Sequence, residues 1–307
     1  MSTRYKHISV TPVTGALGAE VAGVQLAKAS VDKEIMAEIQ QAFAQHLVLF
    51  FRDQKLETVD QERFAGAFGP LTKHPFIGTL PNSDYTAPLI RDADATGLNF
   101  GGEWHCDGTF VERPSKGCVL RSIETPPWGG DTLWANLILA YDTLSEGMKK
   151  LADSLILIHS AANAYDPDRG ATDKDKSRIA QKGISHALKV TEDPKKEMEH
   201  PLVRIHPETG KKILWVPGPY ALRFKGMSEA ESKPLLDELH QHAIHPEFTC
   251  RFRWYDGSVA MWDNRATQHF AVNDYSGYRR EMHRVMFGGE RPYGPAMPMQ
   301  PEQRAAA

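Results

Sequence analysis

A histidine and an aspartate two positions apart are the first residues in this chain whose types and spacing suggest metal chemistry. They are His105 and Asp107, in the stretch EWHCDGTF. If this stretch is extended, both side chains lie on one face, with Cα atoms about 6.5–7 Å apart, and Cys106 faces away. Imidazole and carboxylate together suit iron, zinc or manganese. A hydrogen-bonded His–Asp pair is the alternative, and a metal site needs a third ligand.

Two other histidines also precede an acid by two positions, and each has a structural explanation. His206 opens HPETG, the expected turn of a hairpin over residues 200–216, which predicts a surface position for the pair. His245 follows the end of a predicted helix, where the next residue, a proline, marks a stop and histidine suits the helix dipole. We therefore expect no chemistry at either pair.

His269 is the candidate third ligand, because it lies between two predicted strands near the end of the chain. In the strand that follows, REMHRVMF, alternation places Arg280 and Arg284 on one face together with two methionines. Two arginines on such a face are expensive to bury without anionic partners. Their Cα atoms lie about 13 Å apart, which suits two separate carboxylate- or sulfonate-type ligands. The alternative is a pair of surface arginines beside exposed methionines.

The chain that must position these residues is mostly strand. Short strands are expected within residues 7–26, and LVLFF, residues 47–51, is typical of a buried strand. GCVLRSIE, GGDTLWANL and LILIHSA are strand-like in the middle of the chain, and FTCRFRW, GSVAMWD and REMHRVMF follow in the last third. The sequence predicts a mostly β fold with peripheral helices, built as a single domain over residues 1–307.

Helices are expected at four places. One begins near Ser30 with apolar residues four apart, a second covers about residues 58–68, and a third covers about residues 140–152. A fourth opens on the capping box SEAE and runs to about residue 242. Residues 166–186 are strongly polar, which predicts a surface excursion that acts as a lid over a site.

Composition excludes several classes of function. Of 307 residues, 41% are hydrophobic, and the net charge is −3 with no basic block, so nucleic-acid binding has no electrostatic support. No apolar run approaches the roughly 20 residues that span a membrane, and MSTRYKHISV lacks the apolar core of a signal peptide. Three scattered cysteines without a CxxC motif predict free thiols in the cytoplasm.

Taken together, WHCDGTF, GGDTLWAN and WDNRATQHFAVNDYSGYRREMHRV resemble the taurine dioxygenase family of iron(II)/2-oxoglutarate-dependent dioxygenases. That family includes alkylsulfatase and phenoxyalkanoate dioxygenases, and the resemblance covers nearly the whole chain. It implies a double-stranded β-helix, or jelly roll, with helices packed outside. It also implies that His105, Asp107 and His269 bind Fe(II) as a facial triad, which leaves three positions open. By the same resemblance, Thr132 and Arg280 bind the distal carboxylate of 2-oxoglutarate.

The resemblance implies a small anionic organic substrate, which is hydroxylated as O2 and 2-oxoglutarate are converted to succinate and CO2. The matching substrate residues are His74 and Arg284 for the anionic head group and Phe110, Tyr165 and Tyr220 for the aromatic lining. Core packing is the alternative role of these aromatic residues. A dimer or tetramer is common in the family, so we expect a homo-oligomer.

Two departures from the family pattern concern the pocket around the amino group of taurine. Gly101 replaces an asparagine, and Ile77 replaces a tyrosine. These losses argue against taurine itself and favour a larger or less polar organic acid. The candidates are a sulfonate, an alkyl sulfate or an aryloxyalkanoate.

Two rival functions use the same residues differently. A cupin-like metal-dependent hydrolase or isomerase would use the three ligands without 2-oxoglutarate, and a non-catalytic binding module would keep the fold alone. Thr132 and Arg280 discriminate against the first, since such an enzyme needs no dedicated dicarboxylate anchor. The complete set of ligands, anchor and substrate arginine argues against the second.

Overall fold

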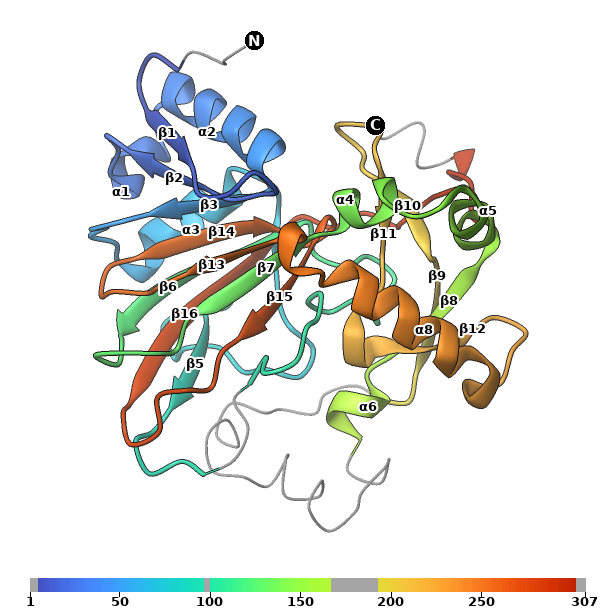
Figure 1. Ribbon diagram of the computed structural model, residues 1–307. Coiled ribbons are helices and arrows are strands. Elements are labelled where there is room, and N and C mark those ends of the chain that lie inside the picture. The colour runs from blue at the N-terminus through green and yellow to red at the C-terminus, as the bar shows by residue number, and fades with distance from the viewer. Residues whose placement is uncertain (1–4, 97–99, 167–192, 302–307) are drawn as a thin grey trace.

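The computed structural model describes residues 5–96, 100–166 and 193–301, and strands form its main framework (Figure 1). The larger sheet is eight-stranded, in the order β1-β2-β3-β14-β6-β16-β4, with β5 also paired to β16. Its neighbours are antiparallel except for the parallel pair β2–β3. The strands are β1 (Ser9–Pro12), β2 (Ala19–Ala22), β3 (Val48–Phe51), β4 (Leu71–Thr72), β5 (Ala87–Arg91), β6 (Gly117–Glu124), β14 (Val259–Asp263) and β16 (Arg280–Phe287).

A smaller sheet faces the large one. Its order is β13-β7-β15, from strands β7 (Thr132–Asn136), β13 (Thr249–Phe252) and β15 (Thr267–Ala271). Apolar residues from both sheets pack into one cluster between them. In that cluster Phe50 stacks on Phe252 at a centroid distance of 4.1 Å and meets Trp134 edge-on at 5.3 Å. The strands that carry the candidate site residues are therefore held against each other by an aromatic core.

The opposite face of the large sheet is covered by helices. These are α1 (Leu26–Ala29), α2 (Lys33–His46) and α3 (Thr58–Gly66). Buried residues of these helices join Val119, Val285 and Phe287 of the sheet in a second apolar cluster. The helix expected from Ser30 begins three residues later, because the Asp32 side chain accepts hydrogen bonds from two backbone N–H groups of the first turn.

A third region packs beside the two sheets (Figure 1). It contains the sheet β12-β8-β9, the hairpin β10–β11 and most of the remaining helices around their own apolar cluster. The elements are α4 (Leu137–Asp142), α5 (Glu146–Ser154), β8 (Ile156–Ser160), α6 (Ala162–Tyr165), β9 (Glu197–Pro201), β10 (Val203–Ile205), β11 (Lys212–Leu214), η1 (Gly218–Tyr220), β12 (Ala221–Phe224), α8 (Glu229–Ala243) and η2 (Pro246–Phe248).

The predicted mostly β fold with peripheral helices is confirmed, and one helix prediction is wrong. The helix expected over residues 140–152 is two helices, α4 and α5. Asn136 caps the first and Ser145 caps the second, each by accepting backbone hydrogen bonds, so the chain starts a new helix there. The α8 helix has the predicted capping box of Ser228 and Glu231.

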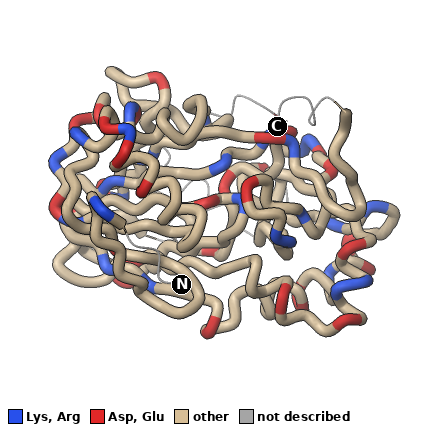
Figure 2. The backbone as a smooth tube through the Cα atoms, turned by 90° about the horizontal axis from the view of Figure 1, so that it is seen from above, with Lys and Arg blue, Asp and Glu red and all other residues tan. Residues whose placement is uncertain are grey.

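Three further expectations concern the surface. The lid-like excursion predicted over residues 166–186 falls almost entirely on residues 167–192, outside the described part of the chain. Basic and acidic residues are interspersed rather than gathered by sign (Figure 2). Within the described ranges, no helix is long and apolar enough to cross a membrane.

Candidate active site and metal centre

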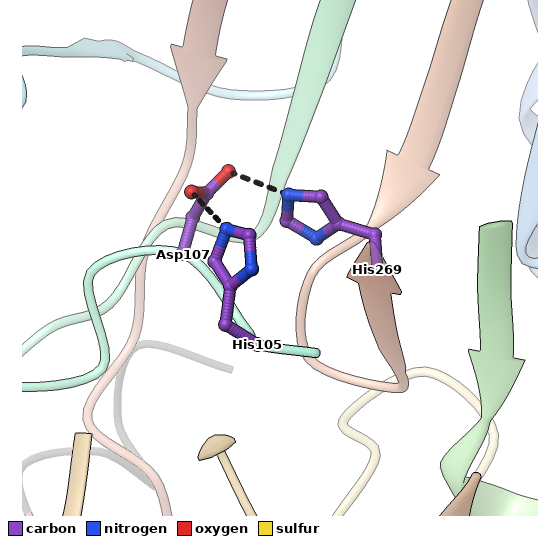
Figure 3. Close-up of side chains that lie close together, drawn as sticks. All are labelled: His105, Asp107 and His269. Atoms are coloured by element: carbon purple, nitrogen blue, oxygen red, sulfur yellow. Dashed lines mark ion pairs between the residues drawn. The ribbon is translucent and has the colours of Figure 1, made fainter. Parts of the chain in front are cut away.

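The three candidate ligands meet in the space between the two sheets. One possible ligand atom from each of His105, Asp107 and His269 lies within 4.8 Å of the others (Figure 3). Nε2 of His105 is 3.6 Å from Asp107 Oδ1, and Nε2 of His269 is 3.8 Å from Asp107 Oδ2. These separations are too long for hydrogen bonds. The arrangement therefore favours a shared ion over the alternative of a hydrogen-bonded His–Asp pair.

The backbone fixes the two histidines relative to each other. His105 forms an isolated antiparallel bridge with His269 in the middle of β15, with N–H···O distances of 3.0 and 2.8 Å. The Nδ1–H of His105 donates to the carbonyl oxygen of Glu103 at 2.7 Å, which leaves Nε2 with its lone pair. Trp262 of β14 packs against the His269 ring at 4.9 Å. Both imidazoles are thus positioned by neighbouring groups of this chain.

The protonation states suit a cation. Burial, reinforced by His105, lowers the pKa of His269 to about 3, so its imidazole is neutral at pH 7. Burial alone would raise the pKa of Asp107, but Arg284, followed by His269, holds it well below its usual range. The site therefore presents a carboxylate and a neutral imidazole, the donor types that non-haem iron uses.

A pocket adjoins the two histidine ligands and contains the predicted 2-oxoglutarate anchor. His105, His269, Thr132 and Arg280 all line it. The Thr132 hydroxyl accepts a hydrogen bond from Trp254 Nε1 at 3.0 Å, so its own hydrogen is oriented for another acceptor. Burial lowers the pKa of Arg280, and its Nε has no hydrogen-bond partner among the described residues. A guanidinium and a hydroxyl donor in one pocket are suited to a carboxylate.

Arg284 lies on the same face of β16, as alternation predicted. Both arginines are buried, and the two methionines between and after them are core residues, so the alternative of a surface face is wrong. Arg284 Nη1 donates to Asp107 Oδ1 at 2.8 Å. Its Nε and Nη2 have no partner within the described ranges.

His74 and the three predicted aromatic residues are also brought to this place. The His74 Nδ1 accepts from the backbone N–H of Phe76 at 3.1 Å, and burial lowers its pKa to about 3. Its Nε2 therefore carries the hydrogen, and that atom is unpartnered within the described chain. Phe110 lies 6.1 Å from the His74 ring and 5.0 Å from Tyr220, and Tyr165 stacks parallel to Tyr220 at 6.4 Å.

The two departures from the family pattern differ in kind. Gly101 lines the pocket with φ +74°, and a Cβ there would lie 3.1 Å from the His105 ring. The backbone at this position is therefore shaped for glycine. Ile77 is buried and directly follows Phe76 in the chain.

The surface position predicted for His206 is wrong, and the position predicted for His245 just after the end of a helix is confirmed. His206 is buried, with its Nε2 3.1 Å from Asp263 Oδ2, because the turn that it opens packs against the β14–β15 loop. Its partner in the motif, Glu208, is half-exposed and pairs with Arg265 at 2.9 Å. His245 lies in an exposed position after α8.

Two residues around Asp107 escaped prediction from the sequence. Asn264 exchanges two hydrogen bonds with the Asp107 backbone, and the Cys118 thiol donates to Asp107 Oδ2 at 3.3 Å. The motif WDN was the available signal for Asn264. A lone buried cysteine in a strand gives no such signal.

Fold and site together are those of a metal-dependent oxygenase. Residues 9–286 match the family described as taurine catabolism dioxygenase TauD, TfdA family, and the chain belongs to that family. It is accordingly a 2-oxoglutarate-dependent, non-haem Fe(II) dioxygenase. The prediction of Fe(II) and 2-oxoglutarate as cofactor and co-substrate is confirmed, and the hydrolase alternative has no support.

Two curated relatives share much of the sequence. An alpha-ketoglutarate-dependent sulfate ester dioxygenase from Pseudomonas putida is 41% identical over 289 residues, 94% of this chain and 92% of the relative. An alkylsulfatase from Acinetobacter baylyi is 38% identical over 286 residues, 93% of this chain and 86% of the relative.

Two solved structures share the fold. A taurine dioxygenase from Burkholderia xenovorans matches with a TM-score of 0.77 and 33% identity, over 95% of this chain and 94% of that one. AAD-2 in complex with Mn(II) and N-oxalylglycine matches with a TM-score of 0.71 and 26% identity, over 93% and 98% of the two chains.

Proposed function

We propose that this dioxygenase oxidises alkyl sulfate esters at the carbon that bears the ester oxygen. His105, Asp107 and His269 would bind the iron, and Arg280 with Thr132 would bind the distal carboxylate of 2-oxoglutarate. The observation that carries the substrate proposal is a set of buried N–H groups without partners in the described chain. They belong to Arg284 and His74, beside the proposed ligands.

The head-group assignment follows from the donors available. Arg284 offers Nε and Nη2, and neutral His74 offers Nε2. Three donors and one positive charge match a sulfate monoester, which has one negative charge spread over three terminal oxygens. Leaving these donors unpaired in a buried site is unfavourable, so an anion with several acceptors should bind tightly.

The organic part of the substrate would face apolar side chains. Phe76, Phe110, Tyr165 and Tyr220 form one buried cluster next to His74. Ile77, the next residue after Phe76, is also buried. These surfaces suit a hydrocarbon chain better than the ammonium group of taurine, which would require polar partners. The two sulfate ester relatives support the same choice over sulfonates and aryloxyalkanoates.

The residues of this chain position the reaction and exclude water. Bound iron supplies the activation of O2, coupled to conversion of 2-oxoglutarate to succinate and CO2. Arg284 and His74 would hold the sulfate group so that the carbon bearing the ester oxygen lies near the ion bound by His105 and Asp107. Hydroxylation there gives a hydroxyalkyl sulfate, in which the C–O bond to sulfate breaks as the hydroxyl proton leaves. The products are an aldehyde and sulfate.

A panel of acids tests the substrate proposal. Succinate formation would be compared for hexyl sulfate, hexanesulfonate, 2,4-dichlorophenoxyacetate and taurine at equal concentrations. We expect hexyl sulfate to give the highest kcat/KM, with equimolar aldehyde, sulfate and succinate. A higher kcat/KM for taurine would contradict the apolar surroundings proposed for the organic part, and a higher value for hexanesulfonate or 2,4-dichlorophenoxyacetate would contradict the choice of a sulfate ester.

The same framework supports three broader proposals. We infer that the two facing sheets form the double-stranded β-helix of the family and that residues 1–307 are one domain. Three free, buried cysteines are compatible with a cytoplasmic location. The homo-oligomer and the lid over residues 166–186 stay predictions, testable by light scattering and by limited proteolysis with and without substrate.

A further inference from the structure

The loop between β14 and β15 places a buried carboxamide on the backbone of Asp107. Asn264 Oδ1 accepts the Asp107 N–H at 2.7 Å, and Asn264 Nδ2 donates to the Asp107 carbonyl at 2.8 Å. The same Nδ2 lies 3.3 Å from both the carbonyl oxygen and the Oγ of Ser115. One side chain thus gives Asp107 both hydrogen bonds that a strand neighbour would provide.

These bonds matter because, among the described residues, the chain around Asp107 has no sheet partner of its own. The bridge between His105 and His269 is isolated and ends before Asp107. Cys106, between His105 and Asp107 in the chain, contacts β15 through its thiol, which lies 3.3 Å from the carbonyl oxygen of Thr267. Meanwhile Arg284 attracts the Asp107 carboxylate through the hydrogen bond that its Nη1 donates at 2.8 Å. A constraint on the Asp107 backbone is needed to oppose that attraction.

The residues on either side of Asn264 fix the loop. Arg265 pairs with Asp263 through Nε at 2.9 Å and Nη2 at 2.6 Å, and His206 Nε2 lies 3.1 Å from the same carboxylate. All three are buried. The backbone N–H of Asn264 donates to the carbonyl oxygen of Lys116 at 3.0 Å. The carboxamide therefore projects from a rigid support.

We propose that Asn264 is a positioning residue that holds Asp107 in its metal-binding position before the metal arrives. The inference rests on the proposed ligand assignment but not on the identity of the substrate. Hydrogen bonds that orient a ligand commonly change metal affinity by about 10–100-fold. Here the hydrogen bonds act on the ligand's peptide group rather than on its carboxylate.

The test is Co(II) binding by metal-free enzyme, followed by its visible absorption, without 2-oxoglutarate or substrate. We expect Asn264→Ala to weaken binding by about 10–100-fold and to alter the absorption of the bound ion. Asn136→Ala is the matched control, because Asn136 is also buried and makes three hydrogen bonds to backbone groups, two at the α4 cap and one to the carbonyl oxygen of Ala16. It should lower the melting temperature while leaving Co(II) affinity within about twofold, well below the range for ligand-orienting bonds. A Co(II) affinity of Asn264→Ala within about twofold of the wild type, well below the range for ligand-orienting bonds, would overturn the proposal.

Two additional measurements keep the outcomes separate. Asp107→Ala should abolish Co(II) binding at this site, and wild-type affinity there would refute the ligand assignment and the inference with it. Should Asn264→Ala fail to fold, hydrogen exchange of the metal-free wild type decides. The Asp107 amide should then exchange as slowly as the His269 amide of β15. Exchange at the rate of exposed loop amides would contradict a preset ligand.

Discussion

Arg280 should destabilise the metal-free enzyme while it serves 2-oxoglutarate binding, so replacing it should separate the two effects. Its guanidinium is buried, burial lowers its pKa, and its Nε has no partner within the described residues. An unpaired buried polar group costs about 1–3 kcal/mol. Arg280→Met removes that group and fills similar space beside Trp254 and Tyr275.

We therefore expect Arg280→Met to raise the unfolding free energy of the metal-free protein by about 1–3 kcal/mol. For 307 residues, with an unfolding entropy of about 2.1 cal/mol/K per residue, the melting temperature would rise by about 1.5 °C per kcal/mol. The assay is calorimetry with and without Mn(II) and 2-oxoglutarate. Saturating 2-oxoglutarate at 100 times its Kd should stabilise the wild type by about 2.7 kcal/mol, and this gain should vanish in the variant.

Arg279→Met is the matched control, one residue earlier. Arg279 is partly exposed and pairs with Glu281 at 2.6 Å and with Glu124. Its loss should cost about 0–1 kcal/mol and leave the 2-oxoglutarate effect intact. The reasoning is refuted if Arg280→Met destabilises the metal-free protein more than Arg279→Met does, or if it keeps the full stabilisation by 2-oxoglutarate.

Three other predictions follow from the same contacts. Arg284→Gln should raise KM for an alkyl sulfate at least about tenfold, since it removes charge-assisted hydrogen bonds worth about 1.5–3 kcal/mol; steady-state kinetics should show KM for 2-oxoglutarate unchanged. Burial lowers the pKa of His200 to about 4. Between pH 6.5 and 4 the unfolded chain therefore binds a proton that the folded chain does not, and the unfolding free energy decreases as the pH is lowered. In urea titrations, His200→Gln should reduce that slope by up to about 1.4 kcal/mol per pH unit, and an unchanged slope would contradict burial of a neutral ring. Gly101→Asn should weaken Co(II) binding by crowding the His105 ring without creating taurine turnover; efficient taurine oxidation by this variant would show that Gly101 only removes a binding group.

Much of the site could be predicted because strands have a period of two. Alternation in REMHRVMF correctly places Arg280 and Arg284 on one face, and the same period in GGDTLWANL turns Asp131 to the face opposite Thr132. Asp131 indeed turns away and accepts from Arg251 Nε at 2.6 Å. The aromatic cluster followed from the family resemblance, since residues so distant in sequence share no local pattern.

The misses have physical causes that a local pattern cannot contain. His206 reads as a surface turn residue, but its burial depends on packing against Asp263 and Arg265, nearly sixty residues later. Asn264 likewise makes its decisive bonds to Asp107, 157 positions away. The break between α4 and α5 was accessible, because Ser145 is a typical N-cap residue.

The most direct test of the account is the fate of hexyl sulfate with and without O2, in the presence of Fe(II) and 2-oxoglutarate. The account predicts that sulfate appears only with O2, together with hexanal and an equal amount of succinate, and that one oxygen atom of labelled O2 enters succinate. Release of sulfate with hexanol in the absence of O2 would contradict it and would make the enzyme a hydrolase.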